Sequence, residues 1–188
     1  MLVQNSNVII NNWITAILED RADVLASISS TQYLENAVKL FDDPEILKKY
    51  RFENVEIILG EISQELHLQI FNDRIPVSLR LRCIHAAFNL FDKWYSNYAG
   101  YSHSCDHFWD IYYNYDQLAA QPLIQEAIFD TLHKILNIRN SECQGSALHG
   151  FNHLRDDRCK PLIDEFIREC TDHDLLDVAK IAKTYGGL

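Results

Sequence analysis

Apolar residues along this chain recur at the spacing of amphipathic helices. Downstream of Pro76 they follow one another in steps of four and three residues, which places them in one stripe on a helix face. This stripe consists of Val77, Leu81, Ile84, Phe88, Phe91, Tyr95 and Tyr98. Arg80 and Arg82 fall away from its centre. Two further stripes comprise Val55, Ile58, Leu59, Ile62, Leu66 and Ile70, and Ile124, Ile128, Leu132 and Ile135. Because no strand-like alternation persists, the sequence predicts an all-α protein.

The pattern predicts nine or ten helices in a single all-α domain over residues 1–188. The expected helices span residues 6–28, 31–41, a short segment from 44, 54–70, 76–98, 104–117, 122–138, 144–155, 161–171 and 174–184. The four prolines, at positions 44, 76, 122 and 161, each precede or open one of these segments. Proline is favoured at the first position of a helix, where its missing N–H costs no hydrogen bond.

The prolines also suggest a repeat of about 40 residues. They lie 32, 46 and 39 residues apart, and PLIQEAIF at 122–129 matches PLIDEFIR at 161–168 in five of eight positions. A repeat of this length that holds two helices is typical of HEAT and armadillo solenoids. The alternative is a coincidence between two amphipathic helices that share a start signal.

On repeat length, helix pairing and the shared PLI(Q/D)E segment, residues 40–171 resemble the HEAT-like, armadillo-type α-solenoid superfamily. The resemblance implies a right-handed superhelix of antiparallel helix pairs over 43–171, with capping helices at 1–42 and a C-terminal cap at 172–188. It also implies a scaffold that binds proteins or peptides on a curved face. One departure is that proline opens the second helix of each pair here, whereas typical HEAT repeats carry it within the first. The segment SALHGFNHL at 146–154 also resembles one in small bacterial helical proteins, which implies no activity.

Charge and cysteine content narrow the classes of function. The chain of 188 residues has 17 Lys and Arg against 27 Asp and Glu, a formal net charge of −10. This balance argues against a nucleic-acid partner, because affinity for phosphate backbones comes mainly from basic residues. The first apolar stretch is too short to span a membrane and lacks the features of a signal peptide. Five cysteines without CxxC spacing favour reduced packing thiols and a cytoplasmic protein.

Two histidine pairs are the candidate metal ligands. His149 and His153 lie four residues apart, which points both imidazoles to one side of a helix. At the repeat offset of 39, Asp110 is equivalent to His149 and could add a carboxylate. Two histidines and a carboxylate suit zinc or non-haem iron. The alternative is that these histidines form hydrogen bonds between layers of helices.

The second pair, His103 and His107, lies beside Cys105, Asp106 and Asp110. His107 could join the first pair in one site if the two helices are neighbours. Helix capping by Ser104 or Asp106 is the alternative explanation of this cluster. Elsewhere, Glu61 and Glu65 lie four residues apart and are expected on a solvated acidic face. Because no phosphate-binding loop or nucleophile motif is present, the sequence leans away from catalysis.

Aromatic residues point to the favoured function, which is binding of another protein. About half of the 21 aromatic residues lie between Phe88 and Tyr115. A helix over 104–117 would carry aromatic side chains on more than one face and leave some of them in a groove. The predicted partner-binding residues are Trp94, Tyr98, Trp109, Tyr112 and Tyr113. The alternative is a locally bulky core.

Acidic residues lie beside these rings and indicate what the groove would bind. Asp106, Asp110 and Asp116 favour a basic or amphipathic peptide. The main hypothesis is therefore a protein- or peptide-binding scaffold without a cofactor, and self-association is a further hypothesis. The alternative hypothesis is a metal-binding protein or a metal-dependent enzyme that uses His149, His153, His107 and Asp110 with zinc or iron.

Overall fold

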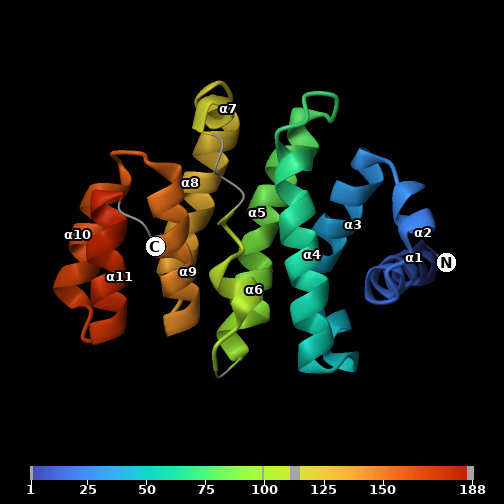
Figure 1. The fold of residues 1–188 in the computed structure, drawn as a ribbon, viewed down its shortest axis with the longest axis horizontal. Helices are drawn as coiled ribbons and strands as arrows, with labels where there is room; N and C mark the ends of the chain where they lie inside the picture. Colours follow the sequence, from blue (N-terminus) through green and yellow to red (C-terminus); the bar gives the residue numbers. More distant parts are fainter. Residues whose placement is uncertain (1, 99, 111–114, 186–188) are drawn as a thin grey trace.

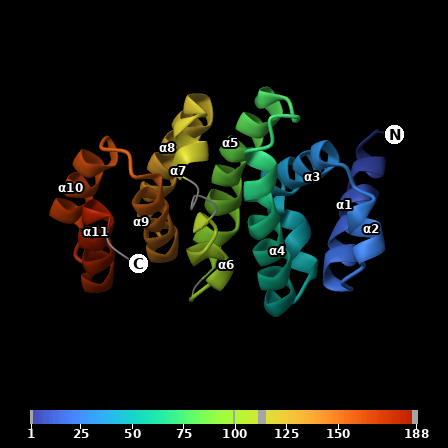
Figure 2. The same cartoon turned by 45° about the horizontal axis from the view of Figure 1, so that its top comes forward.

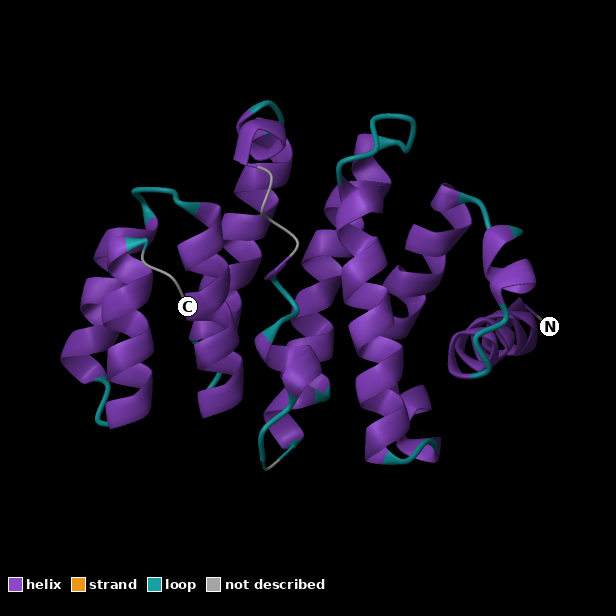
Figure 3. Ribbon diagram, in the orientation of Figure 1, coloured by secondary structure: helices purple, strands orange, loops and turns teal. Residues whose placement is uncertain are grey.

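A computed structural model of the chain describes residues 2–98, 100–110 and 115–185 (Figure 1). The part of the chain so described contains helices and loops and no strand, which confirms the all-α prediction (Figure 3). The longer helices are α1 (Leu2–Leu18), α3 (Ser30–Asp42), α4 (Phe52–Ile70), α5 (Val77–Lys93), α8 (Pro122–Leu136), α9 (Ser141–Leu154), α10 (Cys159–Glu169) and α11 (His173–Thr184). The short ones are α2 (Ala22–Ala26), α6 (His103–Asp106), α7 (Tyr115–Ala119) and the 3₁₀ helices η1 (Pro44–Lys49) and η2 (Tyr95–Asn97).

The helices succeed one another along the long axis of the molecule, from α1 at one end to α10 and α11 at the other (Figures 1 and 2). One row of packed helices consists of α3, α5 and α8, and a second row consists of α1, α4, α6, α9 and α11. A single hydrophobic core runs between the rows, from Ile10 in α1 to Ala182 in α11. The right-handed superhelix implied by the HEAT resemblance stays a prediction.

The prolines mark helix starts, with two differences from the prediction. Pro122 is the first residue of α8, and Pro44 opens η1, which is a 3₁₀ rather than an α-helix. Pro76 is the N-cap of α5. Pro161 lies in the first turn of α10, which begins two residues earlier at Cys159. The two similar segments at 122–129 and 161–168 therefore both lie near the start of a helix.

Three of the predicted helices are wrong in extent, and the one expected over 76–98 ends at Lys93 and is followed by the short η2. The helix expected over 6–28 is broken where Asp20 adopts a left-handed conformation with φ of 49° between α1 and α2. The helix expected over 104–117 is interrupted, because α6 ends at Asp106 and a turn follows at His107. Aromatic residues, His and Asp have only modest helix propensity, so local preference does little to maintain a helix here. Burial of the aromatic side chains therefore decides the local conformation.

Most of the cysteines and Arg80 are also buried in the protein. All five cysteines are free thiols, and four of them are buried. Arg80 is buried as well, although the sequence places it outside the apolar stripe of its helix. No helix among the described residues is long and apolar enough to cross a membrane.

Candidate metal centre

One face of α9 is shaped to receive α6 and the segment that follows it. Ser146, His149, Gly150 and His153 lie on this face at helical spacing. The hydroxyl of Ser146 donates a hydrogen bond to the carbonyl oxygen of Cys105 at 2.5 Å. A Cβ atom at Gly150 would lie 3.2 Å from the Cβ of Trp109. The glycine therefore allows the segment to approach α9 closely.

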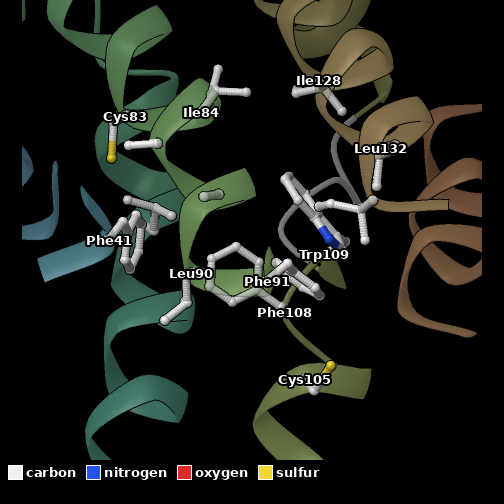
Figure 4. Packing of buried hydrophobic residues seen from close by; sticks show 14 of the residues in the cluster. Phe41, Cys83, Ile84, Leu90, Phe91, Cys105, Phe108, Trp109, Ile128 and Leu132 are labelled. Atoms are coloured by element: carbon white, nitrogen blue, oxygen red, sulfur yellow. The ribbon is translucent and has the colours of Figure 1, made fainter. Parts of the chain in front are cut away.

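Two buried aromatic side chains anchor this segment. Phe108 and Trp109 are 0% and 1% exposed, and their rings lie 5.4 and 6.0 Å from the ring of Phe91. Figure 4 shows Trp109 beside Leu132 of α8, with Phe91 and Phe108 nearby. Because these neighbouring side chains fill the core, the flanking polar residues, His107 and Asp110, are left to face α9.

Asp110 meets three histidines. Its Oδ1 atom lies 3.0 Å from Nε2 of His149 and 3.4 Å from Nε2 of His153. Its Oδ2 atom lies 2.8 Å from Nδ1 of His107. The structure therefore brings together all four residues that the sequence singles out as candidate metal ligands, His149, His153, His107 and Asp110.

A backbone contact orients the ring of His149. Its Nδ1 atom lies 3.1 Å from the carbonyl oxygen of Asp106 and 3.9 Å from the Asp106 carboxylate. The nearer carbonyl can only accept a hydrogen bond, so Nδ1 of His149 carries a proton and donates it. The other ring nitrogen, Nε2, consequently faces Asp110 and His153. Histidine ligands of metal ions are commonly held in this way, through the nitrogen that does not bind the metal.

The charges in this cluster stabilise one another. Burial opposes a charge on His149, but hydrogen bonding to Asp106 and Asp110 outweighs it and raises the pKa of His149 to about 9. Burial alone would likewise raise the pKa of Asp110, yet His149, His153 and His107 hold it well below its usual range. Without a metal ion, the cluster is thus a carboxylate paired with a protonated imidazole at neutral pH.

The spacing of the donor atoms fits a metal ion. Zinc binds histidine nitrogen and carboxylate oxygen at about 2.0–2.2 Å, so two ligands of one ion lie about 2.9 Å apart at a right angle and about 3.3 Å apart at the tetrahedral angle. The 3.0 and 3.4 Å separations around Oδ1 of Asp110 are close to these values. A metal ion at this point would replace the proton on Nε2 of His149.

A second combination of donors lies next to the first but fits less well. Asp106, His107 and His149 also bring one potential ligand atom each within 4.8 Å of one another. However, Asp106 lies on the side of His149 where Nδ1 already donates to a backbone carbonyl. The group formed by Asp110, His149 and His153 is therefore the better candidate for a metal site.

A cavity of about 340 Å³ adjoins the cluster. His107 and Asp110 belong to both, and α4 supplies the opposite wall of the cavity. The remaining lining residues are Gly60, Ser63, Gln64, His67, His103 and Ser104. The ring of His103 packs against that of His107 with centroids 4.2 Å apart, so His103 lies at the cavity and not among the ligands.

The aromatic residues predicted to bind a partner do not form one exposed surface. Trp109 is a core residue, which corrects its expected place in a groove, because its ring fills the space between α5 and α8. Trp94 is half-buried against the core. Tyr98 is also half-buried and stacks on Phe52 at 4.1 Å. Tyr112 and Tyr113 lie outside the described residues, and binding of a partner at these aromatic residues stays a prediction.

Glu56 supports the site, although it was not among the residues predicted from the sequence. Its carboxylate accepts hydrogen bonds from the Ser102 hydroxyl, the Ser104 hydroxyl and the Ser104 backbone N–H, at 2.8, 2.8 and 3.0 Å. These bonds tie the start of α6 to α4. A glutamate within an amphipathic helix carries no local signal for such a contact, which joins residues 46 and 48 positions apart.

Comparisons with protein-family models, with curated proteins and with solved structures find no match to this chain.

Proposed function

We propose that this protein binds one divalent transition-metal ion through Asp110, His149 and His153. The observation that carries the proposal is the convergence of Oδ1 of Asp110 with Nε2 of both histidines at ligand-to-ligand distances. The hydrogen bond from Nδ1 of His149 to the Asp106 carbonyl supports it, because that bond directs Nε2 toward the ion. His107 forms a hydrogen bond with Oδ2 of Asp110, the carboxylate oxygen that does not face His149 and His153, and thereby orients the carboxylate.

The donor set favours zinc or iron(II). Two imidazoles and one carboxylate match catalytic zinc sites and the facial triad of non-haem iron enzymes. Three protein ligands leave at least one coordination position for water or another small molecule, unlike the closed set of four in structural zinc sites. The adjoining cavity gives such a molecule a place beside Asp110 and His107.

Metal titration of the untagged protein tests the proposal. After dialysis against a chelator and its removal, calorimetry with ZnCl₂, and with Fe²⁺ under anaerobic conditions, is expected to show one site per chain. Replacing both histidines, His149→Ala with His153→Ala, is expected to abolish this site. Asp110→Asn preserves the shape of the side chain but removes its charge, and should weaken binding at least tenfold.

A matched variant separates this site from adventitious binding by surface histidines. His133→Ala with His173→Ala removes two histidines that lie on α8 and α11, outside the cluster, and should leave the titration unchanged. Elemental analysis of protein purified without chelators provides an independent readout. If wild-type protein binds no metal stoichiometrically and the His149/His153 double variant only lowers the melting temperature, the cluster is structural and the proposal is wrong.

A further inference from the structure

A second concave surface lies at the N-terminal end of the molecule, far along the chain from the metal cluster. It is a groove of about 710 Å³ between the segment α1 to α3 and the helix α4. Its lining residues are Ile17, Leu18, Asp20, Leu25, Ala26, Ile28, Ser30, Tyr33, Ile57, Glu61, Glu65 and Gln69. This volume is within the range of sites that bind small ligands or anchoring side chains.

Apolar side chains make up much of the groove. Ile17, Leu18, Leu25 and Ile28 contribute from the α1 side, and Ile57 contributes from α4. Ile57 is 51% exposed, although it is large and apolar. Covering these side chains with a partner's apolar groups would be favourable in water.

Carboxylates stand beside these apolar side chains, without basic residues to balance them. Glu61 and Glu65 lie one helical turn apart on α4, and Asp20 contributes from the turn after α1. Like charges at this spacing repel each other on a helix. Within the described parts of the chain, none of the groove's lining residues is basic, and Glu61 and Glu65 form no ion pair with Lys, Arg or His. The groove is therefore suited to a cation.

Tyr33 also lines the groove, and its hydroxyl is influenced by the same carboxylates. Its hydroxyl donates a hydrogen bond to the carbonyl of Ile62 at 3.3 Å. Burial raises the pKa of Tyr33 above its ordinary value, and the nearby charges of Glu65 and Glu61 raise it further. Both carboxylates thus act on one point in the groove, where a positive group would offset them.

We propose that this groove binds an amphipathic basic segment of another protein. Apolar side chains of that segment would pack on Leu25, Ile28 and Ile57, and its Lys or Arg side chains would pair with Glu61, Glu65 and Asp20. This is the mode in which an amphipathic helix lies in a hydrophobic groove. The proposal does not depend on the metal site. It places a basic peptide partner at a different surface from the aromatic residues that the sequence predicts to bind a partner.

A synthetic peptide of defined chemistry tests the proposal. The probe is a 14-residue fluorescent helix made only of Leu and Lys, with every Leu on one face, and its counterpart carries Glu in place of Lys. Fluorescence anisotropy should show binding of the Leu/Lys peptide and at least tenfold weaker binding of the Leu/Glu peptide. The double variant Glu61→Gln with Glu65→Gln should weaken the Leu/Lys peptide at least tenfold.

Two further variants show whether the groove itself is responsible. Asp92→Asn with Asp130→Asn removes two exposed carboxylates from α5 and α8, so it changes net charge equally, and binding should stay within twofold of wild type. Ala26→Trp should block the groove with a bulky ring and abolish binding.

Three results would overturn the proposal. The first is no binding of the Leu/Lys peptide by wild-type protein. The second is an equal loss in the two charge variants, which would indicate unspecific attraction to an acidic protein. The third is a wild-type dimer in light scattering that the variant with Glu61→Gln and Glu65→Gln does not form, which would identify a second copy as the occupant.

Discussion

Gly60 and Gly150 both lie inside helices, yet a methyl group at the two positions would meet different surroundings. A Cβ atom at Gly60 has no neighbour within 4 Å, whereas one at Gly150 would lie 2.4 Å from Cδ2 of Leu132. Gly150→Ala is therefore expected to lower the free energy of unfolding by about 1–3 kcal/mol, as overpacked cores do. Gly60→Ala should raise it by about 0.5–1 kcal/mol, because alanine restricts the unfolded chain more.

Urea unfolding followed by circular dichroism measures both changes under one set of conditions. Gly60→Ala also serves as the control for helix propensity, since it makes the same substitution in α4. The metal titration adds a second readout, because displacement of Trp109 should carry Asp110 away from the histidines. Equal changes of stability in the two variants would show that Gly150 is not needed for close packing of α9.

At the level of single residues, the sequence predicted the members of the cluster around Asp110 better than it predicted the residues that support them. Spacing alone placed His149 and His153 on one side of a helix, and the repeat offset selected Asp110. The helix expected over 104–117 is interrupted after Asp106, so the contact of Asp110 with both histidines depends on Phe108 and Trp109 filling the core. Those long-range contacts have no signature in local sequence, and neither does the role of Gly150.

Among the helical elements, α6 is too short to be stable by itself. It has four residues, and an isolated helix needs about 12–15 residues to form in water. Three hydrogen bonds to Glu56 hold its first turn, and the hydroxyls of Ser102 and Ser104 are otherwise buried. Glu56→Ala is expected to lower the free energy of unfolding by about 2–3 kcal/mol, because it removes a charged acceptor from buried donors.

The same substitution should also weaken metal binding, since α6 leads directly to His107 and Asp110. Calorimetry at a temperature where the variant is folded tests this coupling. Glu35→Ala is the matched control, because Glu35 is an exposed glutamate within α3 and should change neither quantity measurably. An unchanged metal affinity in the Glu56 variant would mean that α6 does not position the site.

Helix ends were predictable where a local signal marks them. Pro122 opens α8 as expected, whereas α9 begins at Ser141, before its expected start at 144, with Asn140 as the N-cap that accepts a hydrogen bond from the N–H of Cys143. The break within the segment expected over 104–117 was not predictable, because Phe108 and Trp109 continue the aromatic pattern through it. The break within 6–28 falls at Glu19, Asp20 and Arg21, where charged residues interrupt the apolar stripe.

For the whole molecule, the periodicity sufficed for the class of fold and for the order of helices along the chain. It did not reveal how distant segments are joined, since the polar residues that join them resemble surface residues in sequence. Arg80 is the clearest example. It lies on α5 between Leu79 and Leu81, is 6% exposed, and contacts residues from two other parts of the chain.

Arg80 links the end of α4 to the turn before α8, and this link leads to a prediction for the whole fold. Its guanidinium donates hydrogen bonds to the carbonyl of Ile70 at 3.1 Å and to Oε1 of Gln121 at 2.6 Å.

Arg80→Met should lower the free energy of unfolding by about 2–4 kcal/mol, because both acceptors lose their donor. Arg82→Met, two residues along α5, removes only an exposed contact with Asp42 and should change it by less than about 1 kcal/mol. Urea unfolding of the two variants compares a buried arginine with an exposed one on the same helix. Similar losses of stability would show that the link between α4 and α8 contributes nothing beyond ordinary surface charge.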